Sequence, residues 1–456
     1  MSGCSPKKTP VPLFVAILCA WFLPRCVDAQ DDVAPPPANA REVFARYDIG
    51  PAQFSRFVDG GPISSGEEEV LVKILLRFSR LGLENIHRWR KTDVNWNAIA
   101  AATHQRQGEL FVIRGRAKLV TEHPLPPELA GRLEFAHYYA VNLAIEHSPH
   151  EALVLTRTVP KAWSIGTPFD EPAVVDGLLL KLGAPSEGRQ QFVFAAGRVS
   201  WLPDSSRLAR AGFDVSLFDQ VHQSNGQGLL GDDREPFYQL LAAISRVERT
   251  ERDPTSTPLD VVPLLEQPEA HHGEFLPVRG TARRIVKVAI SDAGVRERLG
   301  LDHYYEIDLF VPLGAAKLRF GEANKIDESP VFENTFPVTL IARQLPPGLA
   351  EGELLHEQVA ADAVFFKLWT YQSPYMARFN RVQPAPLLMT HEPRLVPVVE
   401  QENWVSSGLI TATLAGVLLV GAVALWWYRR GDEAYREQRR RQLRSGEQAR
   451  PDFRGL

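Results

Sequence analysis

The sequence predicts an α+β protein: two tandem copies of a helix-plus-five-stranded OB-like β unit, followed by one transmembrane helix. Three observations predict it. The phrase RLEFAHYYAVNL at Arg132–Leu143 returns as RLGLDHYYEIDL at Arg298–Leu309. Each copy continues into short apolar runs separated by Pro-containing turns, a pattern typical of β-strands. The segment Gly408–Tyr428 contains no charged side chain. As a helix it would be about 31 Å long, which matches the hydrocarbon core of a bilayer.

The segment 1–29 predicts a cleaved secretory signal peptide, and 30–46 a linker. An early Lys-Lys pair supplies positive charge, Val11–Leu23 is apolar, and VDA at 27–29 is a small-residue cleavage site. The apolar run Val11–Leu23 is too short to span a bilayer as a helix. The mature chain is therefore expected to begin at Gln30.

Near-constant offsets extend the repeat beyond the His-Tyr-Tyr triplets, which themselves recur at an offset of 166. GELFVIRG at Gly108–Gly115 returns as GEFLPVRG at Gly273–Gly280, at an offset of 165. VDGLLLKL at Val175–Leu182 returns as ADAVFFKL at Ala361–Leu368, at an offset of 186. An insertion of about 20 residues around Gly314–Phe332 explains the larger offset.

Each repeat unit is expected to open with a capped helix. Ser65-Gly66-Glu67-Glu68 fits a capping box, and an apolar stripe follows it. Asp232 to Glu235 precede a similar stripe in the second copy. The expected boundaries are 47–204 for repeat unit 1, with helix 66–82 and β unit 108–203, and 205–398 for repeat unit 2, with helix 233–248 and β unit 273–397.

Turn residues divide each β unit into five expected strands. A break after the third strand, and a first strand that can bend at Gly115 or Gly280, are typical of an OB-like barrel. An open five-stranded sheet packed on the helix fits the same pattern. The expected strands are 109–121, 135–147, 151–159, 175–184 and 190–202 in the first copy, and 274–290, 303–312, 335–343, 361–371 and 385–397 in the second.

Strand alternation places the two tyrosines of each triplet on opposite faces. Tyr139 and Tyr305 fall on the apolar face and are expected in a core. Tyr138 and Tyr304 fall on the more polar face, where a tyrosine either covers the sheet or stacks on a ligand. We favour covering, and keep both residues as ligand-binding candidates.

Four basic residues occupy matching positions in the two copies. Lys181 matches Lys367, with an apolar or aromatic neighbour on the same face, and Arg114 matches Arg279. Such a repeated set could line a groove for an acidic or glycan ligand. The alternative is that the lysines snorkel at strand edges and the arginines close turns.

No motif identifies a catalytic, cofactor or metal site. Gly226–Gly231 is formally G-x-G-x-x-G, but no buried strand precedes it. H-E-x-x-H, P-loop and G-x-S-x-G patterns are absent, and all three cysteines precede position 30. We therefore expect no cofactor and no metal. A carboxylate pair for glycoside hydrolysis stays open, because its separation depends on the fold.

Charge and aromatic residues predict the orientation and the partners. Trp404 and the sequence WWY flank the apolar stretch, so 404–428 is expected to insert in the lipid bilayer. The tail, 429–456, carries +4 and the presequence +2, whereas the chain carries −4, so residues 30–403 carry −10. This predicts a periplasmic ectodomain that binds no nucleic acid, and a cytoplasmic C-terminus that can contact anionic lipid headgroups.

Two segments, AVFFKLWTYQS at Ala363–Ser373 and PAPLLMTHEPRLVP at Pro384–Pro397, resemble single-pass membrane proteins of planctomycete-type bacteria. The resemblance covers repeat unit 2 and the anchor. It implies a bacterial source and a membrane location, and brings no assigned activity and no site residues.

These features together predict a membrane-anchored binding or scaffold protein of the bacterial cell envelope, at the inner membrane. It is expected to be non-catalytic and to bind protein or glycan through its ectodomain. Two alternatives stay open: a cell-wall or polysaccharide hydrolase that uses carboxylates, and a sensor subunit that signals through a partner.

Overall fold

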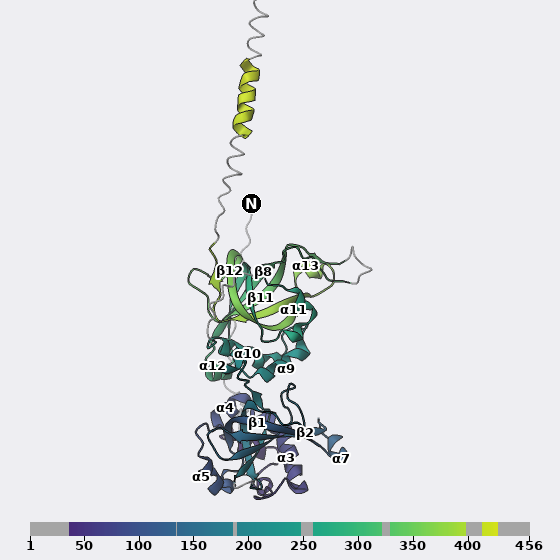
Figure 1. Cartoon of the computed structure of the whole chain (residues 1–456), viewed down its shortest axis with the longest axis vertical. Coiled ribbons are helices and arrows are strands. Elements are labelled where there is room, and N and C mark those ends of the chain that lie inside the picture. Colours follow the sequence, from purple (N-terminus) through teal and green to yellow (C-terminus); the bar gives the residue numbers. More distant parts are fainter. Residues whose placement is uncertain are drawn as a thin grey trace, which may run out of the picture. The chain divides into compact units, whose positions relative to one another are not determined.

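The computed structural model describes residues 36–133, 135–185, 189–247, 259–321, 329–397 and 413–426. Contacts divide the chain into two units, Met1–Arg394 and Leu395–Leu456, which are described separately. The first unit holds both repeats, and it combines helices with two six-stranded sheets (Figure 1). The predicted signal peptide and cytoplasmic tail lie outside the described residues.

Helical structure in the first repeat begins earlier than expected. α1 lies inside the predicted linker, and Phe44 of this helix is fully buried. The predicted helix 66–82 is α3 followed by the short 3-10 helix η1. The helical elements of this repeat are α1 (Ala40–Ala45), α2 (Pro51–Phe54), α3 (Ser65–Arg77), η1 (Phe78–Leu81), α4 (Leu83–Trp89), α5 (Trp96–Ala101), α6 (Thr103–Arg106) and α7 (Pro127–Ala130).

The capping box of α3 is real but lies one residue earlier than predicted. Ser64 is the N-cap, and its hydroxyl accepts the Glu67 N–H, while the Glu67 carboxylate accepts the Ser64 N–H at 2.6 Å. Glu68 therefore takes no part in the capping box, because in such a box the N-cap residue pairs with the third residue of the helix. The apolar stripe is confirmed, since Val70 and Ile74 are buried.

Five strands of the first repeat close into a barrel. β1 pairs with both β2 and β4, and the ring runs β1-β2-β3-β5-β4. The β3–β5 pair is parallel, and the other pairs are antiparallel. The open-sheet alternative is therefore wrong. The strands are β1 (Leu110–Pro124), β2 (His137–Ile145), β3 (Glu151–Thr156), β4 (Glu171–Leu182) and β5 (Gln191–Ala196), with β6 (Ser200–Trp201) added to β4.

The second repeat has the same topology. Its ring runs β7-β8-β11-β13-β12, again with one parallel pair, β11–β13. The expected insertion holds a two-stranded sheet, β9 with β10, between the second and third strands of this barrel. The strands are β7 (Phe275–Ala289), β8 (His303–Pro312), β9 (Leu318–Arg319), β10 (Val331–Phe332), β11 (Thr335–Ala342), β12 (Gly352–Tyr371) and β13 (Gln383–Thr390), with β14 (Arg394–Leu395) added to β12.

The expected helix 233–248 is shorter in the structure. The 3-10 turn η4 leads into α10, which ends at Ile244. The helical elements of the second repeat are α8 (Arg207–Arg210), η2 (Val215–Leu217), α9 (Phe218–Val221), η3 (His222–Ser224), η4 (Gly231–Asp233), α10 (Arg234–Ile244), α11 (Val262–Glu266), η5 (Pro268–Ala270), α12 (Ala293–Leu299) and α13 (Pro374–Ala377).

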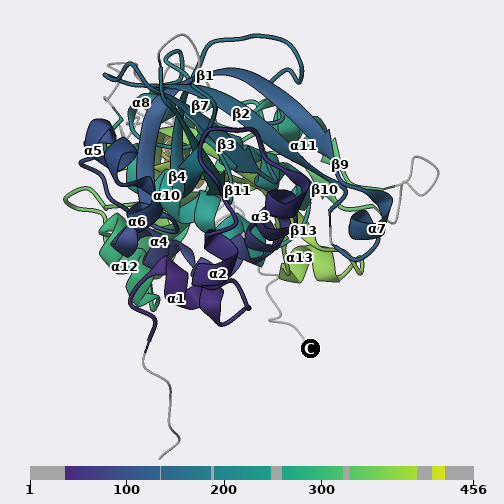
Figure 2. The ribbon, with the colours of Figure 1, turned by 90° about the horizontal axis from the view of Figure 1, so that it is seen from below.

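Each repeat has two apolar cores, one inside the barrel and one between the barrel and its helices. In the first repeat, Val141 and Leu143 lie in the interior core, whereas Leu71 and Leu155 lie in the helix-side core. Helices α1 to α4 gather on one side of the strands of this barrel (Figure 2). The outer face of several strands is therefore also buried, which the alternation pattern alone does not predict.

The second unit contributes one described helix, at 413–426, inside the predicted membrane segment 404–428. The remainder of that segment lies outside the described residues. Over the part of the chain that the structure describes, no helix has the length and apolar character needed to cross a bilayer.

Candidate ligand-binding cleft between the repeat units

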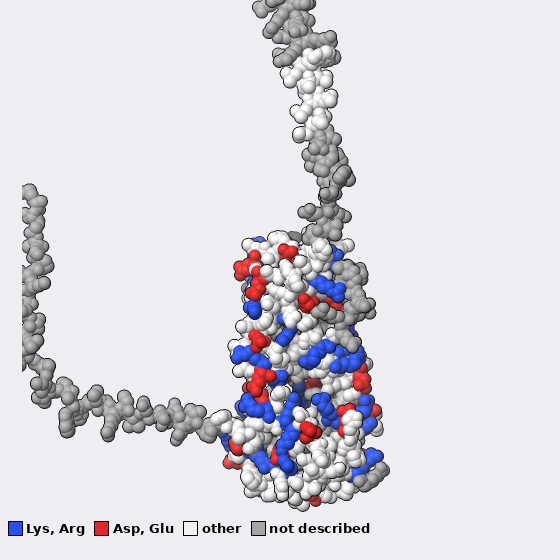
Figure 3. Space-filling view, turned by 90° about the vertical axis from the view of Figure 1, so that its left-hand side faces the viewer, with Lys and Arg blue, Asp and Glu red and all other residues white. Residues whose placement is uncertain are grey.

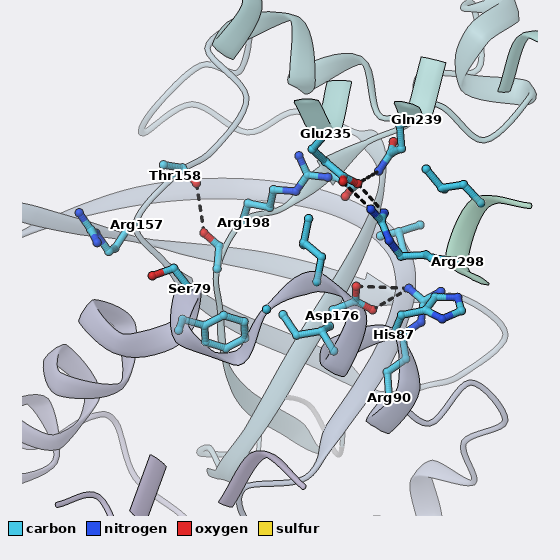
Figure 4. A pocket seen from close by; sticks show the side chains of 18 of the residues that line it. Ser79, His87, Arg90, Arg157, Thr158, Asp176, Arg198, Glu235, Gln239 and Arg298 are labelled. Carbon is cyan, nitrogen blue, oxygen red and sulfur yellow. Dashed lines mark hydrogen bonds and ion pairs between the residues drawn. The ribbon is translucent and has the colours of Figure 1, made fainter. Parts of the chain in front are cut away.

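A cleft of about 620 Å³ lies within the first unit, where the two repeats meet. Figure 4 shows polar side chains from both repeats along it, with Arg157 at one end and Arg90 and Arg298 at the other. Its walls come from η1 and α4 of the first repeat and from α10 and α12 of the second. A volume of this size is typical of sites for small molecules or short segments. Five arginines line it: Arg90, Arg157, Arg198, Arg246 and Arg298.

Two short helices position the apolar part of the cleft. Gly82 has a φ of 73°, and this left-handed residue separates η1 from α4. Because residues three and four apart share a helix face, Leu83, Ile86 and His87 of α4 turn to the same side. Leu299 adds an apolar side chain from α12.

The polar wall is one face of α10. Glu235, Gln239 and Ala242 are spaced by four and three residues, so they share a face, and Arg246 continues it just past the end of the helix. The opposite face packs into the helix-side core through Leu240 and Leu241. The same spacing is present in the predicted helix 233–248, but none of the predicted site residues lies on that helix.

Three of the arginines are paired with carboxylates. Arg298 binds Glu235 through both guanidinium Nη atoms, at 2.5 and 2.6 Å. Arg90 contacts both oxygens of Asp176, at 3.1 and 3.3 Å. Arg198 lies 3.2 Å from the Asp214 carboxylate. The two acidic residues that line the cleft, Asp176 and Glu235, are thus both held as ion-paired carboxylates.

The other two arginines have no carboxylate partner among the described residues. The Arg157 guanidinium stacks over the Phe135 ring, 4.4 Å from its centroid. The Arg246 Nε donates to the Ala211 carbonyl oxygen at 2.9 Å. His87 adds no charge at neutral pH, because burial and the neighbouring Arg90 hold its pKa below the usual range. Counted over the described residues, the cleft therefore carries uncompensated positive charge.

Lys and Arg side chains are also frequent on the face of the molecule in Figure 3, where acidic side chains are interspersed among them. The predicted ectodomain is acidic in total, so the excess of positive charge in the cleft is local. Low-dielectric walls concentrate the field of such a cluster and favour an anionic ligand.

None of the six ligand-binding candidates predicted from the sequence lines this cleft. Lys181 and Lys367 do not line a groove, and they do not snorkel, because both are buried. The Lys181 ammonium donates to the Glu67 carboxylate at 2.7 Å, and the Lys367 ammonium lies 2.9 Å from the Asp233 carboxylate. The solvent access expected for both was wrong, because the helix N-terminus covers this strand.

These two ion pairs are the same contact in two copies. Each carboxylate also accepts a backbone N–H at its capping position, from Ser64 in one repeat and Leu230 in the other. Burial alone would raise the pKa of Glu67, but the Lys181 ammonium and two backbone N–H groups hold it below the usual range. The pair therefore fastens the helix to the barrel.

The tyrosines follow the predicted alternation, but the polar face is not open. Tyr139 and Tyr305 pack against the interior cores, as predicted. Tyr138 is buried in the helix-side core, and its hydroxyl donates to Glu68 at 3.1 Å. Tyr304 packs against Phe237 of α10. The helical layer covers Tyr138 and Tyr304, whereas Glu306 and Asp308 on the same face of β8 stay partly exposed and pair with Arg284.

Arg114 and Arg279 are exposed and lie on matching first strands. Neither lines the cleft. The structure therefore does not bring the six predicted residues into one site. Ligand binding by any of them stays a prediction.

No family model matches the chain, and no curated protein is similar to it in sequence. Solved structures give distant likenesses. One is a single-stranded DNA binding protein from Thermus aquaticus, with 8% identity over 64% of this chain and 94% of that one, at a TM-score of 0.14. Another is a putative aspartyl-tRNA synthetase from Leishmania major Friedlin, with 9% identity over 52% and 49%, at a TM-score of 0.17. Scores this low support no inference about fold or function.

Proposed function

We propose that the protein is a membrane-anchored, extracytoplasmic binding or scaffold protein of the bacterial cell envelope. Its ligand is a protein or a glycan, which it binds without catalysing a reaction. The observation that carries the proposal is the arginine-lined cleft between the repeat units. Binding there needs no residues beyond those present, since guanidinium groups recognise carboxylates and phosphates directly.

The architecture supports a scaffold role. We propose that each repeat is an OB-like barrel, because five strands close in the order first-second-third-fifth-fourth with a parallel third–fifth pair. Barrels closed on themselves have few free strand edges, which suits a protein that presents surfaces to partners. The apolar segment 404–428 would hold the two barrels at the membrane, with 429–456 on the cytoplasmic side.

The alternative of a carboxylate-dependent hydrolase has less support at this site. Such an enzyme needs one carboxyl group that is protonated as a general acid and a second that stays ionised. The two carboxylates that line the cleft, Asp176 and Glu235, each form an ion pair with an arginine, so neither faces the cleft as a free carboxyl group.

Site-specific photo-crosslinking in the native cells tests the proposal. A photoreactive amino acid at Leu83, 45% exposed in the cleft, should yield an adduct with envelope protein or glycan. The same amino acid at Leu354, 89% exposed and away from the cleft, is the control. Equal adducts at both positions would contradict the proposal. So would polysaccharide hydrolysis by the purified chain that is lost in Asp176→Asn or Glu235→Gln.

A further inference from the structure

The two arginines without a carboxylate partner among the described residues come from different repeats. Arg157 directly follows β3 of the first repeat, and Arg246 lies just beyond the C-terminal end of α10 in the second. Both line the same cleft. An anion that contacts both must therefore bridge the two repeats, so the binding site exists only where the repeats are docked.

Both guanidinium groups are held in place while most of their donors stay available. The Arg157 Cζ lies over the Phe135 ring, and no described residue accepts a hydrogen bond from its five N–H groups. Arg246 donates through Nε to the Ala211 carbonyl oxygen, and its terminal N–H groups have no hydrogen-bond acceptor among the described residues. Pre-positioned donors lose less side-chain entropy when a ligand binds.

The rest of the cleft distinguishes between classes of anion. Apolar side chains from the helices form part of its lining, among them Leu75, Leu83 and Leu299. Within the described part of the chain, its aromatic side chains apart from histidine are Phe78 and Phe135, and the face of Phe135 is occupied by Arg157. Single-stranded nucleic acid needs aromatic platforms on which successive bases stack. A peptide offers carboxylates for the arginines and aliphatic side chains for the apolar wall.

We propose that the cleft binds an acidic peptide segment of a partner protein, with carboxylates of that segment on Arg157 and Arg246. This inference rests on the proposed binding function and specifies its ligand. The ion pairs Arg90–Asp176 and Arg298–Glu235 shape the walls of the site, and the guanidinium groups of Arg157 and Arg246 supply the attraction.

Fluorescence anisotropy with a labelled hexaglutamate peptide tests the inference, using the full chain in a non-ionic detergent. Arg157→Gln and Arg246→Gln should each weaken binding about tenfold or more, because each removes a charge-assisted hydrogen bond. Arg157→Lys, which keeps the charge, should lose less. The matched control is the double variant Arg56→Gln/Arg381→Gln, which removes the same charge from two exposed sites outside the cleft, one in each repeat, and should bind as the parent chain does.

Unchanged binding by the Arg157→Gln/Arg246→Gln double variant, with an unchanged melting curve, would overturn the inference. Preferential, Arg157-dependent binding of an oligogalacturonate or of a single-stranded oligonucleotide would also overturn it. If hexaglutamate does not bind but Leu83 still gives its specific adduct in cells, the peptide assignment fails and the proposed binding function stands. If the Leu83 adduct is absent as well, both fail.

Discussion

The closest correspondence between the two repeats is a single buried contact. Lys181 and Glu67 are 1% and 4% exposed, and Lys367 and Asp233 are 0% and 1% exposed. Taking a charge out of water costs several kcal/mol, so a buried ion pair is stable only when both partners are present and hydrogen-bonded. Here the carboxylate of each pair also serves as a helix cap, which supplies the additional hydrogen bonds.

Replacing Lys181 with Met should therefore lower the free energy of unfolding by about 3–5 kcal/mol, because it leaves the buried Glu67 carboxylate without its cation. Urea unfolding measures this. The matched control is Lys73→Met, whose exposed partner Glu69 lies one helical turn away, and it should cost no more than about 0.5 kcal/mol. Similar losses in the two variants would show that the buried pair does not fasten the helix.

His272 makes the second repeat sensitive to acid. Its ring stacks on those of Phe218 and Phe365, and burial, together with nearby His222 and Lys367, lowers its pKa from 6.5 to about 3. Between these values the unfolded chain binds a proton that the folded chain does not. Stability should thus fall as the pH drops from 6.5 towards 3, by at most about 1.4 kcal/mol per pH unit.

The first repeat suggests the variant that tests this. Gln107 occupies the position that corresponds to His272, where its side-chain amide donates to the Phe57 carbonyl. His272→Gln should therefore be tolerated and should flatten the pH dependence of the urea midpoint over that interval. An equally steep dependence in the variant would assign the acid sensitivity to other groups.

One residue difference between the repeated phrases also has an explanation. Asn142 of the first copy pairs across the strands with Leu119, whereas Asp308 of the second pairs with Arg284. The Arg284 guanidinium lies 3.3 Å from Asp308, so the carboxylate occurs in the copy where the opposite residue is a cation. A local cross-strand ion pair accounts for the change without a ligand.

At the scale of elements, a repeated irregularity in the barrels directs the buried lysines. The β4–β5 register shifts between Leu179 and Lys181, and the β12–β13 register shifts between Phe365 and Lys367. A bulge re-aims the side chains beside it. Each lysine can thus meet the capping carboxylate of the helix outside the barrel.

The first strand of each barrel has a glycine where the neighbouring strand approaches closely. A Cβ on Gly115 would lie 2.1 Å from the Ala144 carbonyl oxygen, and one on Gly280 would lie 2.5 Å from that of Phe310. Because these contacts are with backbone, relief requires movement of the neighbouring strand. Glycine at these two positions is thus explained by the close approach of the neighbouring strand.

Gly115→Ala should destabilise the fold by about 1–3 kcal/mol or more, because it overpacks a strand contact that cannot relax. Gly66→Ala is the control, since no atom lies within 4 Å of its added Cβ in α3, and it should be neutral or slightly stabilising. Thermal unfolding followed by circular dichroism compares the two. A neutral Gly115→Ala would mean that the β1–β2 contact is looser than the structure describes.

At the scale of the whole described molecule, docking of the repeats creates the cleft. α4 of the first repeat contacts α12 of the second, where a Cβ on Gly294 would meet the Glu84 carboxyl group. The Arg198–Asp214 ion pair also joins the repeats. These contacts place Arg157 and Arg246 around one cavity, although the two arginines lie far apart in the chain.

The sequence by itself determined the repeat, the approximate strands and which tyrosine of each triplet points into a barrel. These follow from periodicity, which is local: the alternation around Tyr139 and Tyr305 holds whatever packs outside the strand. The sequence also predicted a capped helix in the first repeat, with its N-cap one residue after the observed N-cap, Ser64.

Only the tertiary structure decided what covers the outer faces, and with it the role of most candidate residues. The sequence pattern places Tyr138 and Lys181 on the surface of the sheet. In the structure a helix packs over them, and this burial depends on contacts between distant segments of the chain. The cleft arose in the same way. Arg157 follows a strand and Arg246 follows a helix, and neither belongs to a local motif, so their shared cavity exists only where the two repeats are in contact.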